Sequence, residues 1–119
     1  MIESTKLTSW WKALLEQAAG APPTIRALWF GLAATDTGWD LYVTGCDVFD
    51  PDDDLGDWAC DPTWWPDNNS VPLPGTTEDP LEHAAKLVYA LSPEESWPSP
   101  LQGIAVGYDD GDFTLVWTT

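Results

Sequence analysis

The sequence predicts a small α+β domain with a four-stranded, mainly antiparallel sheet and two helices packed on one face. Two segments repeat apolar residues at helical spacing, and four segments favour extended strands. The elements follow in the order α-β-β-long loop-α-β-β, which is typical of α+β folds. The chain has 119 residues, so residues 1–119 are expected to form one domain around one core.

Both helices are marked by apolar stripes and by the residues at their ends. In residues 5–19, leucines and tryptophans recur at helical spacing, and Gly20 follows where a helix end favours glycine. Residues 80–91 follow Asp79, a residue suited to an N-cap, and Glu82 completes a capping box. We therefore expect two amphipathic helices that each bury one side.

The four strands are predicted as two hairpins. Residues 24–34 are apolar on both alternations, as in a central strand, and residues 38–46 alternate between apolar and polar side chains. Residues 103–108 and 113–118 flank a turn with Asp110-Gly111 as its central residues, which strongly favours a hairpin. In the last strand, alternation places three apolar side chains on one face: Phe113, Leu115 and Trp117.

Residues 47–78 are predicted to be irregular. Five prolines interrupt this segment, and each removes a backbone hydrogen-bond donor. A loop of about 30 residues is uncommon inside a compact domain and is usually functional. Its aromatic residues indicate that it folds against the rest of the protein.

The charge of the chain is regional. The formal net charge is −16, and the 59 residues between Arg26 and Lys86 contain thirteen carboxylates and no basic side chain. Eight aspartates lie between Asp47 and Asp67, interleaved with tryptophans. Such a region attracts cationic partners and repels nucleic acid and anionic membranes, which leaves a basic protein as the expected partner.

The sequence predicts a cytoplasmic protein with no membrane association. Its N-terminus lacks the apolar core of a signal peptide, and no apolar run is long enough to span a bilayer. In a cytoplasmic setting, Cys46 and Cys60 are expected to be reduced, with a disulfide between them as the alternative.

Catalysis is not indicated, and we expect neither an enzyme nor a cofactor. His83 is the single histidine, and it falls off the apolar stripe of its predicted helix. A nucleophilic serine or cysteine needs a base within hydrogen-bonding reach, and the chain offers no other histidine. A glycine-rich phosphate loop is also absent from the sequence.

A calcium site is an alternative interpretation of the acidic loop. Asp50, Asp52 and Asp54 match the first three ligand positions of an EF-hand, but Leu55 stands where that loop needs glycine. No predicted helices flank the segment, so we assign no metal site. A cation site of another kind would use five aspartates: Asp50, Asp52, Asp53, Asp54 and Asp57.

Two adjacent tryptophans, Trp64 and Trp65, allow two interpretations. Both rings cap the core beneath the long loop, or one ring is exposed as an anchor for a partner. Interface hot spots are enriched in tryptophan, whereas acidic residues act through steering and charge pairing. An acidic loop with an exposed tryptophan would suit a partner that is basic and partly apolar.

Three segments carry a resemblance to a known class of proteins. They are Gly45-Cys46-Asp47-Val48-Phe49-Asp50, Asp57-Trp58-Ala59-Cys60 with Trp64 soon after, and Gly107-Tyr108-Asp109-Asp110-Gly111-Asp112. With its small size, its acidity and its many tryptophans, the chain resembles the immunity proteins of bacterial polymorphic and contact-dependent toxin systems. The resemblance implies a non-enzymatic inhibitor that binds one cognate toxin and blocks its active site or substrate groove. Toxins of such systems are often nucleases with basic clefts.

The leading hypothesis is therefore an inhibitor of a cognate toxin or another basic protein. The alternatives are a DNA mimic that inhibits a DNA-binding protein, and a calcium-binding module. The sequence makes no prediction of oligomeric state. The expected partner-binding residues are Asp50, Asp52, Asp53, Asp54, Asp57, Trp64, Trp65, Asp109, Asp110 and Asp112.

Overall fold

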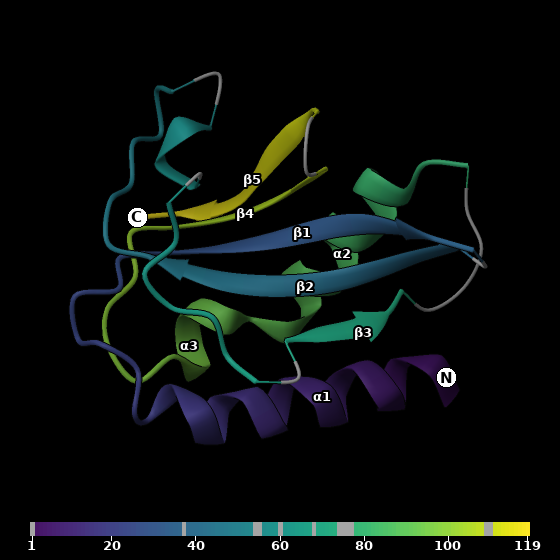
Figure 1. Cartoon of the computed structure of the whole chain (residues 1–119), viewed down its shortest axis with the longest axis horizontal. Helices are drawn as coiled ribbons and strands as arrows, with labels where there is room; N and C mark the ends of the chain where they lie inside the picture. Colours follow the sequence, from purple (N-terminus) through teal and green to yellow (C-terminus); the bar gives the residue numbers. More distant parts are fainter. Residues whose placement is uncertain are drawn as a thin grey trace.

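Figure 1 shows the fold of the chain as a computed structural model that describes residues 2–36, 38–53, 56–59, 61–67, 69–73, 78–108 and 111–119. Within these ranges the chain forms α-helices, one 3-10 turn and β-strands. In chain order they are α1 (Ile2–Ala18), β1 (Ala27–Thr35), β2 (Gly38–Cys46), η1 (Asp57–Ala59), β3 (Ser70–Pro72), α2 (Pro80–Leu91), α3 (Pro93–Ser96), β4 (Gly103–Tyr108) and β5 (Phe113–Thr118).

The strands form one five-stranded mixed sheet in the order β3-β2-β1-β4-β5. β1 pairs antiparallel with β2 and parallel with β4, while β3 and β5 pair antiparallel at the two edges. The α+β class is confirmed, but the expectation of four strands is wrong because β3 forms within the segment predicted to be irregular. The central β1–β4 pair is parallel because the chain crosses over through α2 before it returns as β4.

Most element bounds agree with the sequence analysis. β2, α2, β4 and β5 begin and end at the predicted residues. α1 begins three residues earlier than expected and ends at Ala18, and the first strand begins at Ala27. The one-turn helix α3 was not predicted.

α2 begins at the Asp79 N-cap that the sequence predicts and ends at Ser92. The Asp79 Oδ1 atom accepts a hydrogen bond of 3.1 Å from the Glu82 N–H, which satisfies one of the free donors of the first turn. At the other end, Ser92 adopts a left-handed conformation with φ of 49° and donates its N–H to the Tyr89 carbonyl. Pro93 then starts α3 instead of continuing α2.

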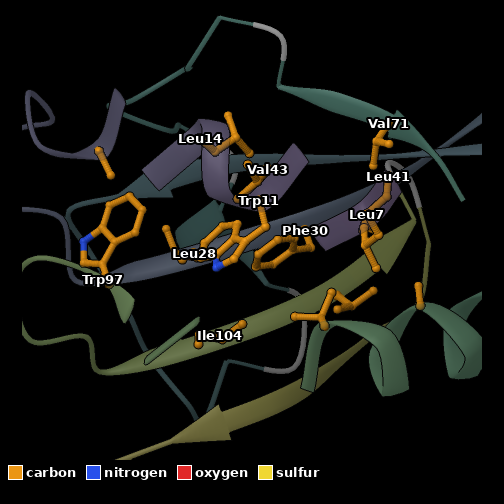
Figure 2. Close-up of a cluster of buried hydrophobic side chains, with 14 of the residues drawn as sticks. Leu7, Trp11, Leu14, Leu28, Phe30, Leu41, Val43, Val71, Trp97 and Ile104 are labelled. Atoms are coloured by element: carbon orange, nitrogen blue, oxygen red, sulfur yellow. The ribbon is translucent and has the colours of Figure 1, made fainter. Parts of the chain in front are cut away.

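We call the side of the sheet that the helices α1 and α2 cover the first face, and the opposite side the second face. The main core lies between the first face and these two helices. Trp11 of α1 packs against Phe30 of β1, with ring centroids 5.7 Å apart, and Figure 2 shows these rings side by side. Trp11 Nε1 also donates to Ser96 Oγ at 3.2 Å, which ties α1 to α3. Ala84 and Val88 of α2 belong to the same buried cluster. Both long helices therefore cover one face, as predicted.

The second face of the sheet is covered by the segment that follows β2. Figure 1 shows this segment, in teal, leaving the end of β2 and rising beside β4 and β5. Glycines of β4 let aromatic rings lie flat on the sheet: a Cβ at Gly103 would overlap the Phe49 ring, and one at Gly107 would overlap Trp29. Aromatic rings from the loop and from β1 thus replace a helix as the cover of this face.

A β-bulge corrects one detail of the predicted last strand. The register of β4 and β5 shifts between Ile104 and Ala105, so Ala105 faces Leu115 whereas Ile104 faces Trp117. Leu115 packs with the cluster on the second face, and Trp117 packs with the main core. The expectation that Phe113, Leu115 and Trp117 share one face is therefore wrong, because the extra residue reverses the alternation.

Candidate functional site

The acidic loop is closed at its base by an aromatic contact. Phe49 and Trp58 meet edge to face with ring centroids 4.9 Å apart, and Trp58 also packs against Trp29 at 6.0 Å. Only 6% of Trp58 is exposed, and its Nε1 atom is buried with no hydrogen-bond acceptor among the described residues. We call residues 49–58 the acidic loop. Because its ends are joined on the sheet, its described aspartates Asp50, Asp52, Asp53 and Asp57 belong to one loop over the second face.

Two aspartates of the acidic loop shape its backbone. Asp50 Oδ1 accepts a hydrogen bond of 2.9 Å from the Asp52 N–H, and Asp53 Oδ2 accepts one of 2.9 Å from the Asp57 N–H. These are local turn and cap contacts of the kind that aspartate favours. Asp50, Asp52 and Asp57 are exposed, whereas Asp53 is half-buried. The structure thus brings four of the predicted site residues into one loop.

The β4–β5 hairpin meets the acidic loop at Phe113. Gly56 has a φ of +68° and lies against the Phe113 ring, where a Cβ would be 3.1 Å from Cε1. Asp112 directly precedes Phe113 and is exposed. Three other predicted site residues lie outside the described residues: Asp54, Asp109 and Asp110.

The two adjacent tryptophans point to opposite faces of the sheet. Trp64 forms an isolated β-bridge with Gly45, with the Gly45 N–H donating to the Trp64 carbonyl at 3.0 Å. Successive residues of an extended chain alternate in direction, so Trp64 turns to the core and Trp65 to the second face. Trp64 packs edge to face on Trp97 at 5.2 Å, whereas 62% of Trp65 is exposed.

Trp65 rests on a second aromatic ring that the sequence analysis did not select. Its ring stacks on Tyr42 with centroids 6.5 Å apart and an interplanar angle of 11°. Tyr42 in turn lies flat over Gly31, where a Cβ would overlap its ring. In the sequence, Tyr42 was marked only by its place in the predicted strand 38–46, where its side chain points to the side opposite to Leu41. The stack leaves the Trp65 indole exposed above Tyr42.

A pair of hydrogen bonds fixes the segment that carries Trp65. Gln17 of α1 donates from Nε2 to the Asp67 carbonyl and accepts the Asp67 N–H at Oε1, both at 2.7 Å. Asp67 is exposed and follows Trp65 by two residues, so it places a carboxylate near the indole in the chain. The exposed ring therefore belongs to a segment held at the Gly45 bridge and at α1.

The same region offers few means of holding a cofactor. Among the described residues, no three His, Cys, Asp or Glu side chains converge into a metal-binding set. Cys46 is fully buried, and Cys60 lies outside the described residues. His83 is half-buried on α2, which packs on the first face, away from the acidic loop. No helix within the described ranges is long and apolar enough to cross a bilayer.

Comparison of the chain with protein-family models, with curated proteins and with solved structures found no match. The functional argument therefore depends on the site itself. The second face combines exposed carboxylates with one exposed indole, and the sequence places no lysine or arginine between Arg26 and Lys86. Chemically, this arrangement suits recognition of cationic side chains.

Proposed function

We propose that the protein is a non-enzymatic inhibitor that binds a basic protein through the second face of its sheet, as the immunity proteins that its sequence resembles bind their toxins. The observation that carries this proposal is the exposed Trp65, stacked on Tyr42 on the face that the acidic loop covers. An indole held in place loses little conformational entropy when it enters an interface, which favours tryptophan as an anchor.

The charge of the second face supports a basic partner. The carboxylates of Asp52 and Asp57 are exposed, and the chain has no basic residue of its own between 27 and 85 to neutralise them. Their field speeds encounter with a cationic surface, and close charge pairs in an interface have coupling energies of roughly 1.5–7 kcal/mol. An arginine of the partner that lies over Trp65 would add a cation–π contact of about 0.5–2 kcal/mol.

The proposed partner is a toxin whose substrate groove is basic, such as a nuclease. In such a groove, the aspartate carboxylates take the places that substrate phosphates would occupy, so bound inhibitor excludes the substrate. This mode of inhibition requires no chemical step by the inhibitor. It requires only that the loop and the indole reach the groove together, which their shared face supports.

The test compares two double variants that change the net charge equally. The partner is captured from cells that express the chain naturally, and its affinity for purified variants is measured by calorimetry. Asp52→Lys with Asp57→Lys should weaken binding by roughly 100-fold or more, because each lost pair contributes at least about 1.5 kcal/mol. The control, Asp36→Lys with Glu95→Lys, changes two exposed carboxylates outside the acidic loop and should retain most of the affinity.

A second variant tests the anchor. Trp65→Ala should weaken binding by about 30-fold or more, as expected for a hot-spot residue, and should change the free energy of unfolding by less than about 1 kcal/mol. Equal binding by the Asp52/Asp57 double variant and by its control would remove the loop from the interface. If duplex DNA competes with the chain for its partner, and if the chain also binds unrelated DNA-binding proteins, the chain is instead a DNA mimic.

A further inference from the structure

The acidic loop covers only part of the second face. Figure 1 shows the short teal helix η1 on the side where β2 ends, whereas the turn between β1 and β2 lies at the opposite end of the sheet. Near that turn, Ala33 of β1 and Asp40 of β2 pair in register, and both residues are half-buried. Tyr42 packs with the cluster on the second face, and Asp40 precedes it by two residues in a strand that is paired without a bulge, so both side chains point to that face. Their Cα atoms are roughly 6–7 Å apart along the strand, so the second face carries a carboxylate beside Tyr42.

The Asp40 carboxylate has no partner within the described part of the chain. Its direct neighbours across the strands are Ala33 on β1 and Pro72 on β3, and neither side chain can donate a hydrogen bond. None of the hydrogen bonds and ion pairs among the described residues involves this carboxylate, whereas Asp50 and Asp53 each accept a backbone N–H. Partial burial of an unpaired carboxylate costs free energy, and a bound cation would offset that cost.

The stack of Trp65 on Tyr42 lies next to this carboxylate. Trp64 bridges Gly45, three residues after Tyr42, so Trp65 reaches Tyr42 from the Gly45 side. Asp40 lies on the other side of Tyr42 along β2. An exposed indole, a half-buried phenol ring and a half-buried carboxylate therefore follow one another along the strand. We call Trp65, Tyr42 and Asp40 the ring–carboxylate row.

The chemistry of the ring–carboxylate row selects among cationic side chains. The carboxylate favours a cation, and the two nearly parallel rings, with an interplanar angle of 11°, favour a planar group. The guanidinium of arginine is planar, stacks on aromatic rings and forms two hydrogen bonds with one carboxylate. Its apolar stem can pack along the indole while the charged head reaches Asp40. The ammonium of lysine can pair with Asp40 but has no plane to stack, so the row fits arginine better.

We propose that the ring–carboxylate row binds an arginine side chain of the basic partner, with the stem over Trp65 and the guanidinium paired with Asp40 beside Tyr42. The inference rests on the proposed function, because it names the side chain that the partner presents to this face. It also adds a contact outside the acidic loop. One arginine then fixes the position of the partner, while the exposed aspartates of the acidic loop attract it.

The first test uses single blocked amino acids as probes and needs no partner. N-acetyl-arginine amide is titrated into ¹⁵N-labelled protein at about 20 mM NaCl, where charge interactions are weakly screened. N-acetyl-lysine amide carries the same charge, and N-acetyl-citrulline amide has a similar shape without the charge. The arginine probe should shift the Trp65 indole N–H and the Asp40 amide, and it should bind at least about fivefold more tightly than the lysine probe. The citrulline probe should give no saturable shift.

Two variants test the residues that hold the probe. Asp40→Asn keeps the shape of the side chain and removes its charge, so it should weaken arginine binding at least about fivefold and abolish the preference over lysine. Trp65→Ala should weaken binding by a similar factor, and the loss of its indole resonance identifies that signal in the wild-type spectrum. The control, Asp36→Asn, removes the same charge from an exposed position in the turn between β1 and β2 and should change the arginine affinity less than about twofold.

This inference and the proposed function fail in different ways. Equal affinities for the arginine and lysine probes, shifts confined to the acidic loop, or no shift at all would overturn the inference. An Asp40→Asn variant that binds arginine as the wild-type chain does would overturn it too. The proposed function survives those results if binding of a captured basic partner still depends on Asp52 and Asp57. If no basic partner is found but the arginine probe binds at Asp40 and Trp65, the proposed function fails and the arginine site stands.

Discussion

Trp65 depends on a residue with no side chain. The Tyr42 ring beneath it lies on the backbone of Gly31, and any Cβ at that position would overlap the ring. The exposed indole is therefore the top of a stack that begins in the central strand β1. A change at Gly31 would move Tyr42 first and then the surface on which Trp65 rests.

Gly31→Ala should lower the free energy of unfolding by about 1–3 kcal/mol, because the new methyl group forces Tyr42 out of its position. It should also weaken partner binding, although Gly31 itself is buried. Chemical denaturation gives the first quantity and calorimetry the second. Gly20→Ala is the matched control, since a Cβ there meets only the Gln17 carbonyl oxygen at 3.6 Å, and its stability should stay within about 0.5 kcal/mol of wild type. If the Gly31→Ala variant is as stable as the wild-type chain, Tyr42 is not held against β1.

At the scale of the element, α2 shows how a short helix begins at a defined residue. Its first turn is bonded through the Asp79 side chain, and Pro80 occupies a position where no N–H is needed. Its inner side contributes Ala84 and Val88 to the core, while its outer side lines an open groove together with β5. Loss of the cap would therefore loosen both the core and the contact between α2 and β5.

Asp79→Ala should lower the free energy of unfolding by about 1 kcal/mol, since it removes the acceptor for the Glu82 N–H. Asp79→Asn keeps a side-chain oxygen at the same position and should retain most of the stability. Urea denaturation followed by circular dichroism measures both variants. Equal stability of Asp79→Ala and the wild-type chain would mean that the cap contributes nothing to folding.

The sequence predicted the elements whose signals are local. β2 and α2 were found because alternation and capping depend on neighbouring residues only. β3 was missed because a three-residue strand is too short to show a period, and it forms only by pairing with β2. The parallel β1–β4 pair joins segments about 70 residues apart along the chain, and no local pattern specifies that register.

The candidate site was predictable in composition but not in arrangement. The run of aspartates and the Trp64-Trp65 pair are visible in the sequence. The direction of each indole is not, because it depends on the bridge between Trp64 and Gly45, residues that lie far apart along the chain. The contribution of Tyr42 was hidden for the same reason, since it requires Gly31 of the neighbouring strand.

At the scale of the whole molecule, the two faces of the sheet are covered differently. The first face carries both long helices and most of the buried apolar residues. The second face carries the acidic loop and the exposed indole, with a smaller cluster around Trp29 and Trp58. Changes to the charged surface are therefore separated from the main core by the thickness of the sheet.

Salt should stabilise the free protein. A net charge of −16 destabilises the compact state by self-repulsion, and raising NaCl from about 20 to 500 mM screens it. The melting temperature should rise by a few degrees Celsius, as measured by calorimetry at low protein concentration. The Asp52→Lys and Asp57→Lys double variant should show a smaller rise, because it already carries less negative charge. A melting temperature that falls with salt would contradict this account.

The contact between Phe49 and Trp58 gives the loop a property useful to evolution and to engineering. Because these two rings hold the loop at its base, exposed side chains between them, such as Asp52, can be exchanged while Asp50, Asp53 and Gly56 keep the shape of the loop backbone. Substitutions of a few residues at the tip of the acidic loop can therefore change its binding specificity. The same contact makes the sheet a candidate carrier for grafted recognition peptides.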